Sequence, residues 1–147
     1  MGHTEEETVA ELTELLTRAS WRLRKNERKE LRPFGLSFGQ ARALRLLAEA
    51  PSPMRIGDLA GRLEIVPRSA TTVVDRLEEA GLVTRAMGHE DRRSILVVPT
   101  ANGEKLVSRL KEDRRAGAKN LFAPLSPGEK SELQRLLSIV ATETAET

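Results

Sequence analysis

Residues 59–93 carry first a helical and then a strand-like pattern of apolar positions. Between Pro67 and Leu82, apolar residues recur every three or four positions and predict one buried helical stripe: Ala70, Val73, Val74 and Leu77. Pro67 suits the first position of this helix, and Gly81 suits a left-handed cap after its last turn. Shorter apolar segments flank the helix, at residues 56–63, 82–86 and 94–98. The order helix, tight turn, helix and two-stranded hairpin predicts a winged helix-turn-helix.

Capping signals mark four more helix starts, at Thr4, Ser37, Thr100 and Ser126. We expect the corresponding helices at about residues 5–31, 38–50, 101–122 and 127–144. Residues 54–56 predict a minimal strand that joins the hairpin as a third edge. The predicted fold is mainly α with a small β-hairpin wing. We expect a winged helix-turn-helix over residues 37–99, within a single domain of residues 1–147.

The helices expected at the two ends of the chain have apolar faces that lie outside the helix-turn-helix and need a partner. These faces are formed by Val9, Leu12, Leu16, Leu133, Leu136, Leu137 and Val140. The end helices could fold on each other, or they could pair with a second copy of the chain across a two-fold axis. We favour the second arrangement, and predict a helical dimerisation region over residues 5–32 and 101–144.

The outward face of the 67–82 helix is short, polar and rich in hydroxyl groups. It holds Arg68, Ser69, Thr71, Thr72, Asp75 and Arg76. Hydroxyl groups can bond phosphates or base edges, threonine methyls can touch thymine, and arginine can pair with guanine or phosphate. Such a face on its own is more often ordinary solvated surface. The preceding short helix, the tight turn and the basic hairpin tip that follows favour a helix for the major groove of DNA.

Charge alone does not decide the partner. The chain of 147 residues has 24 Lys and Arg against 22 Asp and Glu, a net charge of +2. Cations and anions also balance across residues 55–98. Any footprint on DNA must therefore come from segregated charge and not from excess positive charge. Aromatic residues make up only 3%, so the core must consist of leucine, valine, isoleucine and alanine, which favours helices.

Several classes of protein are disfavoured by what the sequence lacks. It has no cysteine, which removes disulfides, thiolate metal sites and thiol redox sensing. Its two histidines lie at the terminus and in the hairpin tip, and no phosphate-binding glycine loop or metal-ligand spacing is present. We therefore expect no catalytic residue, no metal and no cofactor. No apolar run approaches a membrane span and the first residues are acidic, so we expect a cytoplasmic protein without membrane contact.

Three motifs follow one another at fitting distances: VDRLEEAGLVTR over residues 74–85, Asp91-Arg92-Arg93, and Thr100-Ala101-Asn102-Gly103. Together they resemble the multiple antibiotic resistance regulator (MarR) family of winged-helix transcription factors, over nearly the whole chain. The resemblance implies a homodimer built by the terminal helices, with two winged lobes that bind a roughly palindromic operator. Repression is the more frequent outcome in that family. A winged-helix module that binds another protein in place of DNA is the alternative.

The resemblance also implies roles for particular residues. Arg93 of the hairpin tip would enter the minor groove, with Asp91 holding its guanidinium; the plainer alternative is a surface ion pair. The expected DNA contacts are Pro67, Arg68, Ser69, Thr71, Thr72, Arg76, Asp91, Arg92 and Arg93. Many family members release DNA when a small aromatic or anionic compound binds, and the candidate contacts here are Trp21, Arg22, Lys25 and Arg42. Packing in a core is the commoner fate of such a tryptophan. Lack of cysteine excludes the peroxide-sensing mechanism of one branch of the family.

Overall fold

A computed structural model describes residues 2–88 and 93–142 of the chain. The chain forms two compact units, one of residues 25–114 and one that joins residues 1–24 to residues 115–147. We call them the winged unit and the terminal unit. The boundaries fall inside the ranges expected for the dimerisation region, whose assignment stays a prediction.

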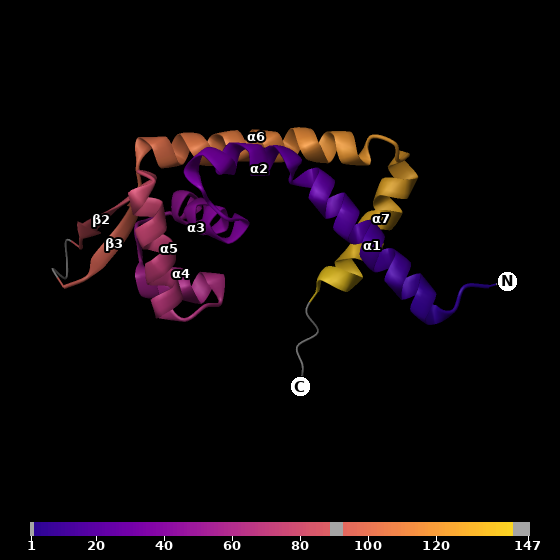
Figure 1. Cartoon of the computed structure of the whole chain (residues 1–147), viewed down its shortest axis with the longest axis horizontal. Coiled ribbons are helices and arrows are strands. Elements are labelled where there is room, and N and C mark those ends of the chain that lie inside the picture. Colours follow the sequence, from indigo (N-terminus) through magenta and orange to yellow (C-terminus); the bar gives the residue numbers. More distant parts are fainter. Residues whose placement is uncertain (1, 89–92, 143–147) are drawn as a thin grey trace. The chain divides into compact units, whose positions relative to one another are not determined.

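The winged unit contains five short helical segments, three strands and the larger, N-terminal part of a long helix (Figure 1). Its elements are α2 (Lys25–Leu31), η1 (Arg32–Phe34), α3 (Phe38–Glu49), β1 (Met54–Arg55), α4 (Ile56–Leu63), α5 (Pro67–Glu79), β2 (Val83–Met87), β3 (Ile95–Pro99) and α6 (Ala101–Phe122). The terminal unit contains α1 (Glu5–Leu23), the end of α6, and α7 (Pro127–Ala141). The order confirms the predicted winged helix-turn-helix fold.

All buried apolar side chains among the described residues belong to the winged unit. Leu44, Leu59 and Leu77 bring one such side chain from each of the three helices α3, α4 and α5, and none of the three is exposed to solvent. Leu82 and Val97 add the base of the hairpin, and the other large buried side chains are Leu106 and Val74. Burial of apolar area is the main favourable term in folding, so this core fixes α5 and the hairpin relative to each other.

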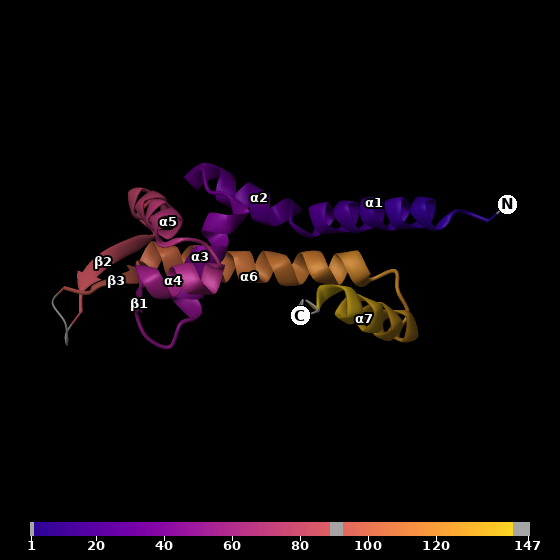
Figure 2. The same cartoon turned by 90° about the horizontal axis from the view of Figure 1, so that it is seen from below.

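The three strands form an antiparallel sheet in the order β1-β3-β2. Met54 pairs with Val97 in one ladder, and Arg85 pairs with Val97 in the other. The predicted third strand at the edge of the hairpin is therefore confirmed. In Figures 1 and 2 the β2–β3 hairpin extends away from α3, α4 and α5, as a wing does.

The local signals that predicted the helix starts are present as hydrogen bonds. Reciprocal capping boxes join Thr4 to Glu7, Ser37 to Gln40 and Ser126 to Glu129. The Thr100 hydroxyl accepts a bond from the Gly103 N–H at 3.1 Å, as an N-cap does. Gly81 has φ of 74°, the left-handed conformation in which a glycine avoids the strain of a side chain. These caps explain why the helix starts were predicted closely.

Two predicted boundaries were wrong. The helix expected over residues 5–31 is broken at Arg24, where α1 ends and α2 begins. The break stands beside Asn26, a weak helix former, and the chain passes there from the terminal to the winged unit. The two hairpin strands begin and end one residue later than expected, at Val83–Met87 and Ile95–Pro99.

The terminal unit has no buried side chain among its described residues. Neither α1, of 19 residues, nor α7, of 15 residues, contains a buried position. Helices of this length gain most of their stability by packing an apolar face, so an uncovered face calls for a partner. In the part of the chain that the structure describes, no helix is long and apolar enough to cross a membrane.

Candidate nucleic-acid interface

The helix α5 buries one face and presents the opposite face to solvent. Ala70, Val74 and Leu77 are fully buried, and Val73 is half-buried. The inward stripe predicted from the sequence is thereby confirmed. Most of the outward side chains of α5 predicted for DNA contact are exposed, namely Pro67, Arg68, Ser69, Thr71 and Thr72. Arg76 is half-buried. The N-terminal half of α5 is therefore exposed to solvent over the residues predicted to contact DNA.

The N-terminal half of α5 is the positive half. The Arg68 side chain is exposed, and within the described ranges it makes no hydrogen bond or ion pair to another residue. The start of a helix also carries partial positive charge from its unpaired N–H groups. Val66 precedes the helix as an N-cap without a side-chain hydrogen bond. The Ser69 N–H bonds to the Val66 carbonyl at 3.0 Å, which leaves the Arg68 N–H without a cap. Arg68 and the helix start therefore offer positive charge to phosphates.

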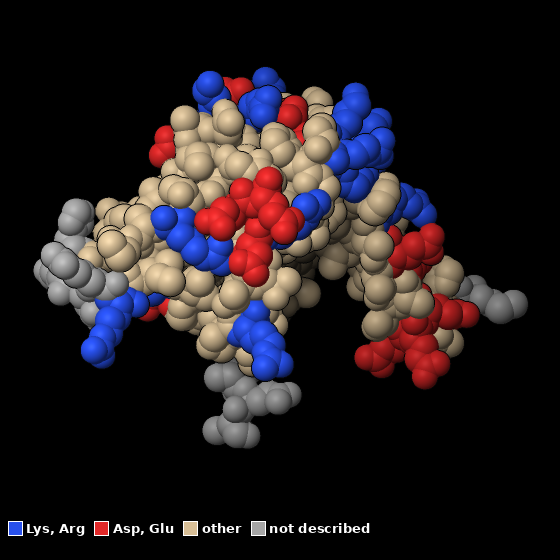
Figure 3. All heavy atoms as spheres, turned by 60° about the vertical axis from the view of Figure 1, so that its left-hand side comes forward, with Lys and Arg blue, Asp and Glu red and all other residues tan. Residues whose placement is uncertain are grey.

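The C-terminal half of α5 carries three carboxylates, and arginines neutralise all three. Arg85 of β2 donates to Asp75 at 2.5 Å and to Glu78 at 2.7 Å. The Asp75 hydrogen bond is the main cause that raises the pKa of Arg85. Arg76 pairs with Glu79 at 3.4 Å. Figure 3 shows acidic atoms flanked directly by basic atoms on the face it displays, not one continuous basic field.

Arg85 also ties the wing to α5. Its side chain is 24% exposed and bridges two carboxylates of the helix from the neighbouring strand. Both Asp75 and Arg85 belong to the stretch that carries the family resemblance. The structure therefore gives these motif residues a structural role. The charges along the sequence could not show whether these residues pair with each other or contact DNA.

We expect Arg85→Met to lower the free energy of unfolding by about 1 kcal/mol, near the upper end for partly exposed ion pairs. The loss should nearly vanish when Asp75→Asn and Glu78→Gln are already present, because the cation then has no carboxylate to neutralise. Urea unfolding of the four proteins of this cycle measures the coupling. An equal loss in both backgrounds would mean that Arg85 acts through its apolar stem alone.

Arg76 makes contacts that the sequence did not reveal. Its Nη2 donates to the carbonyl oxygens of Phe34 at 3.3 Å and Gly35 at 3.5 Å. Gly35 has φ of 63°, and a Cβ there would stand 2.6 Å from the same nitrogen. The guanidinium therefore holds the turn before α3 against α5. The predicted DNA contact of Arg76 stays a prediction, in competition with this role.

The wing offers one described residue of the three predicted there. Arg93 is exposed and lies two residues before the start of β3. Asp91 and Arg92 lie outside the described residues, so the predicted support of Arg93 by Asp91 stays a prediction.

A tight joint connects the hairpin to α6. The Thr100 hydroxyl donates to the Gly81 carbonyl at 2.7 Å, and the Thr100 N–H donates to the Leu82 carbonyl at 2.9 Å. A Cβ at Gly103 would collide with that same Leu82 carbonyl oxygen. The third family-like motif is therefore explained by packing, and it fixes the hairpin base to α6.

The predicted effector contacts are all exposed, and they are divided between the two units. Trp21, which is 63% exposed, and Arg22 lie in the terminal unit; Lys25 and Arg42 lie in the winged unit. None of the four lines the groove beside Phe122 and Leu137, the hollow beside Phe34 and Arg109, or the cavity beside Glu27 and Arg114. Their role in binding an effector stays a prediction, and the alternative of core packing for Trp21 does not apply within a single chain.

The winged unit instead holds a cavity of about 360 Å³ that sequence reasoning missed. Its charged lining residues are Glu27, Arg45, Glu49, Lys111 and Arg114, with Ala41, Val107 and Leu110 between them. Glu27 is only 7% exposed and accepts from Arg114 at 3.3 Å. Burial is the main cause that lowers the pKa of Arg45, because it removes water from the charged form. The residues come from three helices, so no local pattern could reveal the cavity. In the described ranges, no three metal-ligating side chains cluster.

The fold and this surface define a winged-helix DNA-binding protein. The MarR family model matches residues 36–95. The chain is 30% identical to the HTH-type transcriptional repressor Rv2887 of Mycobacterium tuberculosis over 134 residues, which are 91% of this chain and 96% of the relative. The chain belongs to the MarR family.

Solved structures agree with this membership. A MarR family protein from Bacillus stearothermophilus superposes with a TM-score of 0.72 at 26% identity, covering 98% of this chain and 100% of that chain. Rv2887 in complex with DNA superposes with a TM-score of 0.63 at 28% identity, covering 89% of this chain and 98% of that chain. CouR from Rhodococcus jostii RHA1, bound to p-coumaroyl-CoA, gives 0.63 at 26% identity, covering 90% and 93%. With a transcriptional repressor and a DNA complex among its relatives, the chain is a DNA-binding transcriptional regulator.

Proposed function

We propose that the chain is a transcriptional repressor that binds a roughly palindromic operator as a homodimer and is released by a small anionic effector. The observation that carries the proposal is the outward face of α5. Its N-terminal half exposes Arg68, Thr71 and Thr72, while the carboxylates of its C-terminal half are neutralised by Arg85 and Arg76. Such a helix can lie in a major groove without repulsion between carboxylates and phosphates.

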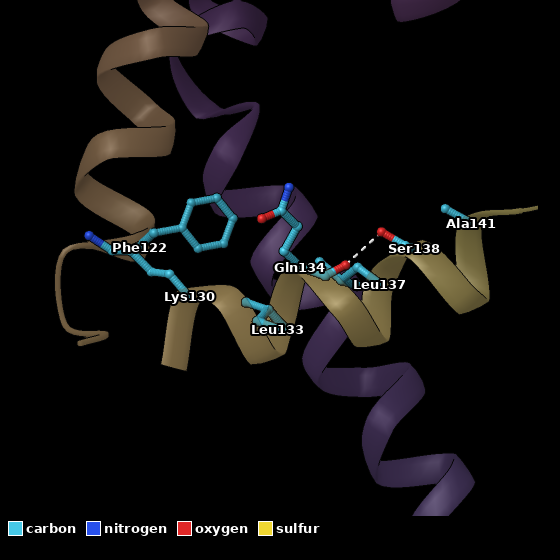
Figure 4. A pocket seen from close by; sticks show the side chains of 7 residues that line it. All are labelled: Phe122, Lys130, Leu133, Gln134, Leu137, Ser138 and Ala141. Atoms are coloured by element: carbon cyan, nitrogen blue, oxygen red, sulfur yellow. Dashed lines mark hydrogen bonds between the residues drawn. The ribbon is translucent and has the colours of Figure 1, made fainter. Parts of the chain in front are cut away.

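The dimer is proposed from the uncovered faces of the terminal unit. Most of the predicted interface residues of α1 and α7 are exposed, namely Val9, Leu12, Leu16, Leu136, Leu137 and Val140. Leu133 is half-buried. Leu133 and Leu137 also line a groove of about 440 Å³ with Phe122 (Figure 4). Contiguous exposed apolar surface marks interaction sites, and a second copy offers an equally apolar face in return.

Two lobes related by a two-fold axis would place two α5 helices in successive major grooves, about one turn of DNA apart. Each wing would then reach the neighbouring minor groove, where a narrow A·T-rich segment concentrates negative potential and attracts Arg93. The DNA complex of the relative Rv2887 supports DNA as the partner.

An anionic effector is supported by the cavity of the winged unit. Arg45, Lys111 and Arg114 line it, and burial already disfavours the charge on Arg45. An anion could bind to these cations, beside the carboxylates of Glu27 and Glu49 that line the same cavity. The family member CouR is seen bound to p-coumaroyl-CoA, a carrier of an aromatic acyl group and of phosphates. We keep Trp21, Arg22, Lys25 and Arg42 as candidate contacts of the effector in the dimer.

The test is binding to the DNA upstream of the protein's own coding region, measured by gel shift at two salt concentrations. We expect salt-sensitive binding that is stronger than to unrelated DNA, because cations displace the counterions of phosphates. Arg93→Ala should weaken it by about 1–3 kcal/mol without loss of folding. Arg18→Ala on α1 removes the same charge, and should leave the affinity unchanged.

Unchanged affinity of a folded Arg93→Ala protein would contradict the role of the wing. No preference for any DNA, together with no effect of Arg68 or Arg93 substitutions, would favour a module that binds another protein.

A further inference from the structure

The hydroxyl groups of the two threonines on the outward face of α5 already donate hydrogen bonds to the helix backbone. Thr71 Oγ1 donates to the carbonyl oxygen of Pro67 at 3.0 Å, one helical turn back. Thr72 Oγ1 donates in the same way to the carbonyl oxygen of Arg68 at 3.2 Å. A hydroxyl has a single proton, so neither group can donate to a base or a phosphate while this bond is kept. What each threonine retains for a ligand is its methyl group and the lone pairs of its oxygen.

The surface at the start of α5 is apolar as well. Val66, the N-cap residue, is 63% exposed and Ile65 is 37% exposed. Pro67, the first helical residue, is also exposed. Serine, threonine or aspartate at the N-cap would accept a hydrogen bond from the first N–H groups of α5. Val66 occupies this position, and its side chain is entirely apolar. Three successive residues at the start of α5 thus expose apolar groups. Because this helix is proposed to enter DNA, these groups would be expected to contact an apolar group of the DNA.

The major groove has one such feature, the C5 methyl group of thymine. The other groups that base pairs present there are hydrogen-bond donors and acceptors, which valine, proline and a threonine methyl cannot pair with. On a helix, residues 68 and 72 lie one turn apart, with residue 71 beside them. Arg68 therefore stands among the apolar groups, ready for guanine or for a phosphate.

We propose that the N-terminal end of α5 selects its DNA by contact with thymine methyl groups, through Thr71, Thr72 and Val66. This inference rests on the proposed function and adds the chemical class of base pair that is read. The operator half-site should then hold thymines under these residues, on either strand. The lone pairs of the threonine oxygens are the competing readout, since they could accept from the amino groups of adenine or cytosine.

Isosteric substitutions separate the two readouts at Thr71. Thr71→Val keeps the branched shape and the methyl group but removes the hydroxyl. Thr71→Ser keeps the hydroxyl but removes the methyl group. Binding of both variants is measured on the same operator, at one salt concentration, beside an operator in which deoxyuridine replaces thymine in the half-sites. Deoxyuridine lacks only the C5 methyl group, so base pairing is unchanged.

We expect Thr71→Val to bind within about twofold of the unaltered protein. Thr71→Ser should bind about fifteenfold more weakly, because the dimer loses one methyl contact, worth about fourfold, in each of its two half-sites. Deoxyuridine in the operator should weaken binding by the unaltered protein and by Thr71→Val. It should reduce the affinity of Thr71→Ser clearly less. Thr72 is tested in the same way. Thr17 on α1 makes the same backbone bond, to Thr13 at 2.8 Å, so Thr17→Ser and Thr17→Val are matched controls for folding.

The opposite pattern would overturn the inference. Loss of binding in Thr71→Val with binding retained in Thr71→Ser would assign readout to the oxygen. Indifference of the unaltered protein to deoxyuridine would also overturn methyl readout, while leaving the proposed function intact. Failure of the unaltered protein to prefer its operator over unrelated DNA would overturn both, and the two failures are thereby distinguished.

Discussion

Leu12→Glu is expected to abolish the dimer and, with it, tight operator binding. Leu12 is 60% exposed in the single chain, between Val9 and Leu16 on the same face of α1. In the proposed dimer this face is covered, so the substitution would bury an unpaired carboxylate in each copy. Such burial costs several kcal/mol and should weaken the dimer at least about a hundredfold.

Sedimentation at several protein concentrations measures the change, and the operator gel shift follows it. We expect a monomer that retains the fold of the winged unit, since the buried core lies in that unit alone. One lobe reaches only one half-site, so the affinity should fall towards that of non-specific DNA. Thr17→Glu adds the same charge to α1 away from the apolar stripe, and should leave the dimer intact. A stable Leu12→Glu dimer would show that the interface uses other residues.

The second large effect is expected at Gly103. The Leu82 carbonyl oxygen occupies the place of a Cβ there, and the side chain of Leu44 stands 3.4 Å away. Leu82 cannot retreat easily, because it is fully buried and its carbonyl also accepts from the Thr100 N–H. Gly103→Ala must therefore displace backbone on one side of the joint, and should lower the free energy of unfolding by about 3 kcal/mol.

Urea unfolding compares this variant with Gly61→Ala. Gly61 also lies in a helix, α4, but has no neighbouring atom within 4 Å of a Cβ. That substitution should raise stability by roughly 0.4–1 kcal/mol, since alanine favours the helix and restricts the unfolded chain. Equal effects of the two substitutions would contradict the joint described here. The hairpin base and α6 meet at this glycine, so Gly103→Ala should also weaken DNA binding in protein that still folds.

Local chemistry explains why most of the fold could be predicted. Four helix starts are set by hydrogen bonds over three residues, as between Ser37 and Gln40, and buried stripes follow a period of three to four. The inward face of α5 and the third strand followed from the same short-range patterns. The break at Arg24 did not, because the residues on both sides of it keep a helical period.

The candidate site was predicted less completely. Arg68, Thr71 and Thr72 were found because a buried stripe on one side of a helix defines what lies on the other. Arg76 was placed with them by the same geometry, yet it donates to carbonyl groups 41 and 42 residues away. The cavity around Glu27 and Arg114 joins residues 87 positions apart, beyond any local pattern.

The sequence by itself determined the elements, their order and the face that α5 presents, because caps, periodicity and turn residues act over a few positions. Only the tertiary structure decided which charges remain available. In the sequence the cations and anions of residues 55–98 balance, and nothing there shows which of them meet. Folding brings Arg85 onto Asp75 and Glu78, and leaves Arg68 exposed. Charge interactions depend on distances in space and not along the chain. The selection of an interface from a balanced sequence is therefore a property of the folded protein.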